Sequence, residues 1–196
     1  MDAKKAIRLM VAMAMVLLSL AFISCASAPL SKSEKEQKQD SVRDMGNQTL
    51  TQLYAKYPAA RDAIAKAAGY AVFSDFGMKF IFMGGAGGSG LAVNNATKQE
   101  TFMKMAEFQP GLGLGASKFR LVFVFETLDA FNSFVTSGWE AGANAMASAK
   151  TKTEGGAIAG AVTVSKGVKM FQLNDEGAIV GVSLTAAKYY KDKELN

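Results

Sequence analysis

The stretch MGGAGGSGLAV, residues 83 to 93, decides between two kinds of fold. Between Gly85 and Gly90 it spells G-x-G-x-x-G, the spacing of a dinucleotide-binding loop. That loop needs a helix directly after its third glycine, because the helix N-terminus holds the pyrophosphate. Here an apolar triplet and then two asparagines follow, which indicates a strand that runs into a turn. A P-loop would need Gly-Lys-Ser or Gly-Lys-Thr, and the sequence contains neither, so we predict a strand and no nucleotide site.

Glycines alternate again between residues 111 and 115, so that three of them share one face of a strand. Such smooth faces let a sheet bend sharply, or let another element approach the backbone closely. The next stretch, FRLVFVF at residues 119 to 125, places large apolar side chains on one face. Glycine faces beside aromatic faces predict a curled antiparallel sheet with a dry interior.

Periodicity divides the rest of the chain into helices and strands. Residues 42–57 carry apolar side chains at three- and four-residue steps, which predicts an amphipathic helix. Pro58 starts a second, short helix that ends before Gly69. Thr127 caps a third helix, which ends at Gly138. The turn sequences SDFG, NNATKQ, QPG and NDEG separate the strands. We predict an α+β fold: a curved, largely antiparallel β-sheet or barrel-like core with N-terminal helices and one mid-chain helix. The predicted strands are Tyr70–Ser74, Met78–Gly84, Gly90–Val93, Thr101–Glu107, Leu112–Ser117, Arg120–Phe125, Ala157–Val164, Val168–Leu173 and Ala178–Leu184.

The composition of the 196 residues excludes several classes of enzyme. The chain has no histidine and one cysteine, so Ser-His-Asp and Cys-His catalysis are impossible and an ordinary zinc site lacks ligands. The DFG tripeptide at residues 75–77 occurs in kinases, but a kinase also needs a His-Arg-Asp loop. We expect no enzyme, no cofactor and no metal. The possible catalytic acids, whose spacing assigns no pair to one site, are Glu107, Glu126, Asp129 and Glu140. Trp139 could bind a ligand, but a tryptophan beside a helix end is more often part of the core.

The N-terminus has the pattern of a secretory signal. Three basic residues precede an apolar run of fifteen residues, Leu9 to Ile23, which is too short for a typical membrane-spanning helix. Two cleavage sites compete. Residues 26–28 have the form Ala-x-Ala, but a proline would follow the cut, whereas Phe-Ile-Ser-Cys resembles the lipobox of bacterial lipoproteins with phenylalanine in place of leucine. We favour the lipobox, because it explains why the single cysteine, Cys25, directly follows an apolar run.

These observations predict a domain plan and a location. Residues 1–24 form a signal peptide, 25–41 a lipidated tether and 42–196 one domain. Residues 29–41 mix both charge signs without apolar periodicity, which indicates a solvated tether or the frayed start of a helix. Fatty acyl chains such as palmitate on Cys25 would anchor the protein in the bacterial envelope, facing the periplasm.

The charge of the chain argues against nucleic acid as a partner. The signal peptide holds three of the 22 basic residues and one of the 17 acidic residues, so the remaining chain carries a net charge of +3. This charge allows contact with an anionic surface, but it is too small to indicate binding to DNA or RNA.

Five blocks of sequence occur together in one order: YPAARDAIAKAAGYAVF, GGAGGSGLAV, TFMKMAEFQPGLGLGASKFRLVFVFET, FNSFVTSGWEAGA and AAKYYKDKELN. From Val42 to Asn196 the chain therefore resembles the SYLF domain, and its bacterial lipoprotein branch in particular. The resemblance implies a module that binds phosphoinositides and other acidic lipids. Some eukaryotic members also bind actin beside SH3 or FYVE domains. This chain has neither partner domain, and ATKQETFMKM replaces the tryptophan-rich segment of many members, which argues against actin as a partner.

Lipid binding in this family is often placed on the N-terminal amphipathic helix, which corresponds here to Val42–Ala68. The resemblance implies phosphate contacts from basic residues and interfacial contacts from aromatic residues of this segment. From the residues alone, the tyrosines could equally pack on the sheet while the charges are solvated, because helical stripes are usually core. The residues concerned are Tyr54, Lys56, Tyr57, Arg61 and Lys66.

The expected function is that of a non-enzymatic, membrane-anchored envelope lipoprotein that contacts anionic phospholipid. The alternative is a structural lipoprotein that binds an envelope protein and touches lipid only through the acyl chains on Cys25.

Overall fold

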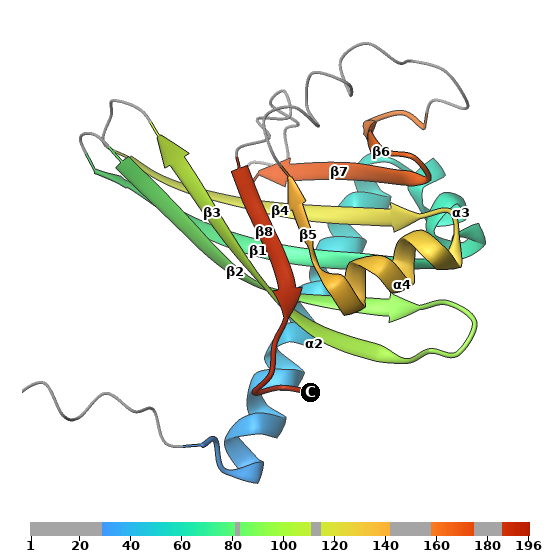
Figure 1. Ribbon diagram of the computed structural model, residues 1–196. Helices are drawn as coiled ribbons and strands as arrows, with labels where there is room; N and C mark the ends of the chain where they lie inside the picture. Colours follow the sequence, from blue (N-terminus) through green and yellow to red (C-terminus); the bar gives the residue numbers. More distant parts are fainter. Residues whose placement is uncertain (1–28, 81–82, 111–114, 142–157, 175–185) are drawn as a thin grey trace, which may run out of the picture. The chain divides into compact units, whose positions relative to one another are not determined.

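The computed structural model describes residues 29–80, 83–110, 115–141, 158–174 and 186–196 (Figure 1). The chain divides into two compact units, Met1–Ser31 and Lys32–Asn196. Every described helix and strand belongs to the second unit, as do both hydrophobic clusters described below. A unit that contains its own hydrophobic core can fold independently. The predicted signal peptide and Cys25 lie outside the described residues.

The described strands form one curved eight-stranded sheet in the order β5-β8-β3-β2-β1-β4-β7-β6 (Figure 1). Every pairing between neighbouring strands of this sheet is antiparallel. The predicted α+β fold with a curved antiparallel sheet is therefore confirmed. The strands are β1 (Gly69–Phe80), β2 (Met83–Asn94), β3 (Glu100–Pro110), β4 (Gly115–Phe125), β5 (Trp139–Ala141), β6 (Ala161–Ser165), β7 (Val168–Asn174) and β8 (Ala186–Lys191).

The predicted turn SDFG is wrong, because Ser74 to Gly77 lie in the middle of β1. Ser74 pairs with Ser89 of β2 on one side and with Arg120 of β4 on the other. Hydrogen bonding to two neighbouring strands outweighs the local turn preference of Ser, Asp and Gly. The predicted break at residues 118–119 is absent for the same reason, and β4 is continuous there.

The glycine-rich stretch forms a strand and no phosphate loop, as predicted. The bounds of the predicted strands Met78–Gly84 and Gly90–Val93 are wrong, because Met78 to Phe80 end β1 and residues 83–94 form one continuous strand. The glycine-rich stretch lies in β2, and Leu91 continues that strand instead of opening a helix. Gly90 is buried opposite Phe73 of β1, and a Cβ atom at Gly90 would lie 2.8 Å from Cγ of Phe73 and closer still to two other ring carbons. The glycine thus makes room for an aromatic ring. The alternating glycines at residues 111–113 lie outside the described residues.

The last strands depart from the prediction. The polar segment after residue 185 supplies β8, which pairs with β3 and β5 and was not predicted. Strands β6 and β7 match the predicted strands in that region, although β6 starts at Ala161. The predicted NDEG turn and the strand Ala178–Leu184 lie outside the described residues.

The described helices are α2 (Lys32–Lys56), α3 (Ala59–Lys66) and α4 (Leu128–Ser137). Thr127 caps α4 as predicted, because its hydroxyl accepts a hydrogen bond of 3.3 Å from the backbone N–H of Ala130. Gly138 ends α4 with φ of 73°, the left-handed region that favours glycine.

Helix α2 begins earlier than the predicted domain. Residues 32–41, assigned from the sequence to a tether or a frayed helix start, are helical and mostly exposed. The C-terminal segment holds this part of α2. The side-chain amide of Gln39 donates to the backbone oxygen of Leu195 at 2.7 Å, and Lys35 Nζ donates to that of Asn196 at 2.9 Å.

The two faces of the sheet carry separate hydrophobic clusters, because side chains alternate along each strand. On one face, Phe73 and Phe123 are fully buried among side chains of α4. On the other face, Val72 and Val122 pack beneath α2 and α3, where Leu53 is fully buried. The helices therefore cover both sides of the sheet, with α4 on one and α2 and α3 on the other.

Candidate functional site

The structure places the predicted lipid-binding residues around the corner between α2 and α3. Tyr54 and Tyr57 are half-buried and pack against the cluster beneath these helices. The ring of Tyr57 lies 6.2 Å from that of Phe171 in β7. Burial raises the pKa of Tyr54, and the nearby Arg61 partly opposes this effect. Both tyrosines thus support the fold at this corner.

The three predicted cations are exposed at the same corner. The guanidinium of Arg61 lies 4.5 Å above the ring of Tyr54, and Lys56 Nζ lies 6.0 Å from the ring centre of Tyr57. Lys66 is exposed in the last turn of α3. Within the described residues, no salt bridge joins any of the three to an acidic side chain. The tyrosine rings hold two of the cations at the surface through cation–π contacts.

The other residues noted in the sequence do not form a site. Trp139 packs against Phe123 and Tyr189, with ring centres 5.6 and 5.8 Å apart, and so belongs to the core cluster beside α4. Glu126 forms a salt bridge of 2.8 Å with Lys169. The side chains of Glu107 and Glu140 lie outside the described set.

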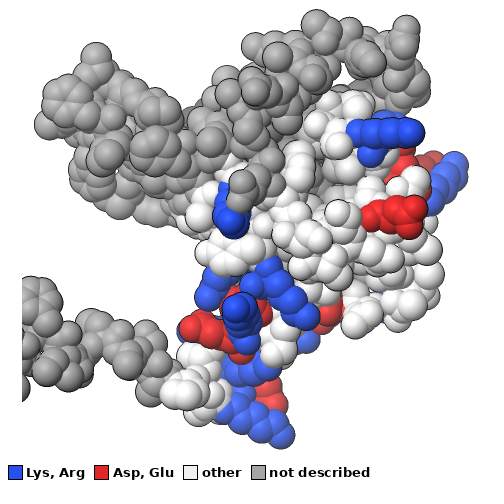
Figure 2. Space-filling model, in the orientation of Figure 1, with Lys and Arg blue, Asp and Glu red and all other residues white. Residues whose placement is uncertain are grey.

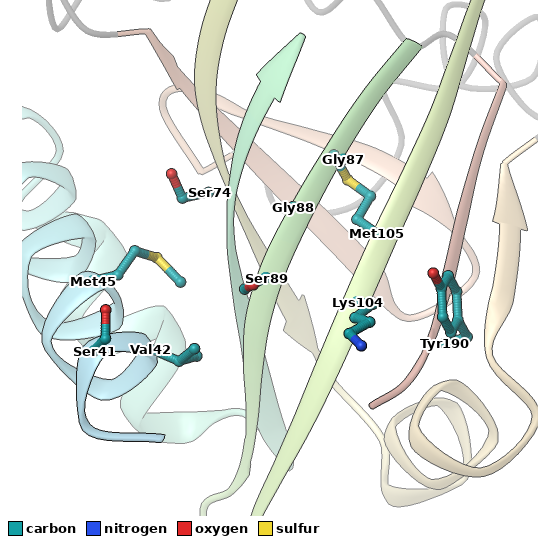
Figure 3. Close-up of a pocket in the computed structure, with 10 residues that line it drawn as sticks. All are labelled: Ser41, Val42, Met45, Ser74, Gly87, Gly88, Ser89, Lys104, Met105 and Tyr190. Atoms are coloured by element: carbon teal, nitrogen blue, oxygen red, sulfur yellow. The ribbon is translucent and has the colours of Figure 1, made fainter. Parts of the chain in front are cut away.

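A pocket of about 530 Å³ lies between the N-terminal half of α2 and the sheet, and no sequence signal pointed to it (Figure 3). We call it the α2 crevice. Its floor consists of small residues, among them Gly87 and Ser89 of β2. Helix α2 forms one side, while β3 and β8 form the other. The lining residues are Ser41, Val42, Met45, Ser74, Gly87, Gly88, Ser89, Lys104, Met105 and Tyr190.

Contacts at both ends of the crevice fix α2 above the sheet. Arg43 Nε donates to a carboxylate oxygen of Glu100 in β3 at 2.9 Å, and this hydrogen bond is the main reason why the pKa of Arg43 is raised. Farther along α2, Arg120 of β4 donates to the side-chain oxygen of Gln52 at 3.2 Å. One residue after Gln52, Leu53 is fully buried in the core between α2 and the sheet. The crevice is thus the part of the helix–sheet contact that small residues leave open.

The charge of the crevice is balanced by the C-terminal segment. Lys104 Nζ lies 3.3 Å from a carboxylate oxygen of Asp192 and 3.2 Å from one of Glu194. Burial lowers the pKa of Lys104, but the two carboxylates more than offset this, so that its pKa is raised. The side chain of Asp192 is only 3% exposed, so one of the two partners is buried. Lys104 is therefore a cation that two carboxylates already neutralise.

The surface around this region is mixed in charge. Figure 2 shows basic and acidic side chains interspersed on the face that contains α2 and the C-terminal segment. The described residues contain no group of three or more acidic, histidine or cysteine side chains that could hold a metal ion. Among the described helices, none has the length and apolar character needed to span a membrane.

The sequence could not reveal the crevice, because it is formed by residues far apart in the chain. Tyr190 and Lys104 come together because β8 pairs with β3, with Tyr190 directly opposite Lys104. Serine and glycine at its floor look like ordinary strand residues in the sequence. The sequence offered one weak indication: Gly87 and Ser89 have small side chains or none, so one face of β2 carries no large side chain that could fill the space beside it.

No family model matches the chain. Over 171 residues the chain is 31% identical to Beta cell expansion factor A of Aeromonas veronii. The alignment covers 84% of this chain but 60% of that protein, so the similarity concerns part of the relative's length.

Proposed function

We propose that the chain is a SYLF-type lipoprotein of the bacterial envelope that contacts anionic phospholipid without catalysing a reaction. The observation that supports this proposal best is the exposed corner between α2 and α3, where Lys56, Arg61 and Lys66 have no salt-bridge partner among the described residues. The blocks of sequence that resemble the SYLF domain, and the lipobox before Cys25, support it as well.

The three cations can supply a useful but modest affinity. A lysine or arginine close to an anionic membrane surface contributes about 1 kcal/mol. Three of them contribute about 3 kcal/mol, which corresponds to roughly a 100-fold change in binding. Stable attachment therefore depends on the acyl chains of Cys25, each buried CH₂ of which adds about 0.8 kcal/mol. In this proposal the corner directs the domain toward an anionic surface to which it is already tethered.

Flotation with vesicles tests the corner separately from the anchor. We would use the chain from residue 29 onward, which lacks Cys25 and contains the whole compact unit Lys32–Asn196. With vesicles rich in anionic phospholipid, we expect co-flotation that the triple variant Lys56→Glu, Arg61→Glu, Lys66→Glu loses.

The matched control changes the net charge equally at another place. Its three exposed lysines lie in α2, in the β6–β7 turn and after β8, and the variant is Lys38→Glu, Lys166→Glu, Lys193→Glu. If this control loses as much binding as the first variant, overall charge and not the corner governs binding. If the unaltered chain does not float at all, the alternative of a protein-binding lipoprotein gains support, and crosslinking in whole cells should then capture an envelope protein.

A further inference from the structure

The α2 crevice is a groove open to solvent, since Ser41, Gly87, Ser89 and Tyr190 of its lining are exposed. Helix–sheet contacts generally pack at the density of organic crystals, with few voids larger than a water molecule. Here the helix faces the sheet with Val42 and Gly46, and a Cβ atom at Gly46 would have no neighbour within 4 Å. Across from α2 the floor is Ser74, Gly87 and Ser89. The small residues of the floor thus leave a volume within the range of about 300–1,000 Å³ that ligand pockets have.

The lining divides into an apolar and a hydroxyl-bearing part. Val42 and Met45 of α2 form an apolar wall, and methionine adapts readily to ligands of different shape. Hydroxyl groups come from three serines and a tyrosine, and none of these side chains makes a hydrogen bond to another described residue. The four hydroxyl-bearing residues are Ser41, Ser74, Ser89 and Tyr190. Such a lining fits an alkyl chain joined to a polar head that can exchange hydrogen bonds.

The charges favour an uncharged head. The only cation in the lining is Lys104, and Asp192 and Glu194 together carry one negative charge more than it can neutralise. A phosphate or carboxylate at this position would have to compete with Asp192 and Glu194 for Lys104, which disfavours its binding. A head that carries hydroxyl groups meets no such penalty.

We propose that the α2 crevice binds a neutral amphiphile, in which one alkyl or acyl chain lies against Val42 and Met45 and a hydroxyl-bearing head contacts the serines and Tyr190. This site goes beyond the proposed membrane contact at the α2–α3 corner. It uses different residues and takes ligands of different charge, so that either site can fail while the other stands.

Calorimetric titration with n-octyl β-D-glucoside, below its critical micelle concentration, tests the proposal on the chain from residue 29 onward. We expect saturable binding of one molecule per chain, with a heat-capacity change that is negative because apolar surface becomes buried. The comparison ligand is n-octyl phosphate, which has the same chain and an anionic head. We expect it to bind at least about tenfold more weakly, because Asp192 and Glu194 already pair with the one cation of the lining. Absence of saturable binding, or tighter binding of the phosphate, would overturn the proposal.

Gly87→Val provides a variant that fills the crevice. Among the described residues, a Cβ atom at Gly87 would have one neighbour within 4 Å, the backbone oxygen of Met105 at 3.9 Å, so the backbone has room for the branch point of valine. We expect its affinity for octyl glucoside to fall at least about tenfold, because its side chain occupies the floor of the pocket. Thr163→Val in β6 is the control, since Thr163 is exposed and does not line the crevice. Equal affinity of both variants for octyl glucoside would refute the assignment of the site.

The same variants separate this proposal from the membrane contact. Gly87→Val should still float with anionic vesicles, while the triple glutamate variant at the α2–α3 corner should still bind octyl glucoside. If the triple variant lost octyl glucoside binding, with its thermal unfolding unchanged, the ligand would bind at the corner and the crevice assignment would be wrong.

Discussion

Replacing Gly90 with alanine should destabilise the protein, because the added methyl group has no space. It would lie 2.8 Å from Cγ of Phe73, and closer to two other carbons of the same ring. The ring cannot move away easily, since Phe73 is fully buried and its ring centre lies 5.0 Å from that of Tyr189 and 6.0 Å from that of Phe123. Inserting a methyl group into such a packed core costs about 1–3 kcal/mol. We take about 2 kcal/mol as the expected loss.

Gly87→Ala is the matched comparison, because it makes the same change three residues earlier in β2. Its Cβ atom would be at an ordinary contact distance of 3.9 Å from a single backbone oxygen. With no clash, alanine should stabilise the protein by about 0.5 kcal/mol, since it reduces the conformational freedom of the unfolded chain. The two variants should therefore differ by about 2.5 kcal/mol.

Urea denaturation monitored by circular dichroism gives both values. With a slope of about 2 kcal/mol per M, the Gly90→Ala midpoint should fall by about 1 M, and that of Gly87→Ala should rise slightly. Equal midpoints for the two variants would refute the reasoning that Gly90 is required by ring packing. A slope that changes with the midpoint would instead indicate an altered denatured state.

Other substitutions and alkaline pH test separate parts of the structure. Gly46→Ala should stabilise the protein by about 1 kcal/mol in urea denaturation, because the site is helical and a Cβ atom there has no neighbour within 4 Å. Leu53→Ala should cost about 3 kcal/mol in the same assay, since it empties a fully buried site between α2 and the sheet. Burial raises the pKa of Tyr54 and of Tyr70. Burial alone would lower the pKa of Lys104, but its two carboxylate partners more than offset this, so the pKa of Lys104 is raised as well. Folding favours the protonated form of all three groups. Their contribution to the free energy of unfolding should therefore be fully present below about pH 10 and should be lost as the pH rises through their folded pKa values. Thermal melting between about pH 8 and 11.5 should show this fall, and a midpoint that stays constant or rises above about pH 10 would contradict it.

That the α2–α3 corner binds lipid stays a prediction, and the structure bears only on where its residues lie. The sequence identified the cations at Lys56, Arg61 and Lys66, and the structure places them on the surface. It left open whether Tyr54 and Tyr57 face outward, and the structure packs both against the sheet. A helical stripe of aromatic residues cannot reveal which surface it meets, because that depends on where the sheet lies.

The sequence by itself determined the class of the fold and the local signals within it. The apolar run at 119–125, interrupted only by Arg120, specifies a strand. The hydroxyl of Thr127 specifies a helix start, and the triplet after Gly90 specifies a strand instead of a phosphate loop. These features depend on residues within a few positions of one another, so that local patterns suffice to predict them.

Only the tertiary structure decided how the strands continue and where the crevice lies. Ser74 to Gly77 look like a turn, but hydrogen bonds from β2 and β4 on both sides keep them in β1. The polar segment at residues 186–191 becomes a strand because the edge of β3 is available to pair with it. That pairing brings Lys104 beside Tyr190, opposite a helix that begins at Lys32. Each of these outcomes depends on partners far away in the chain, whose hydrogen bonds and packing outweigh the weaker local preferences.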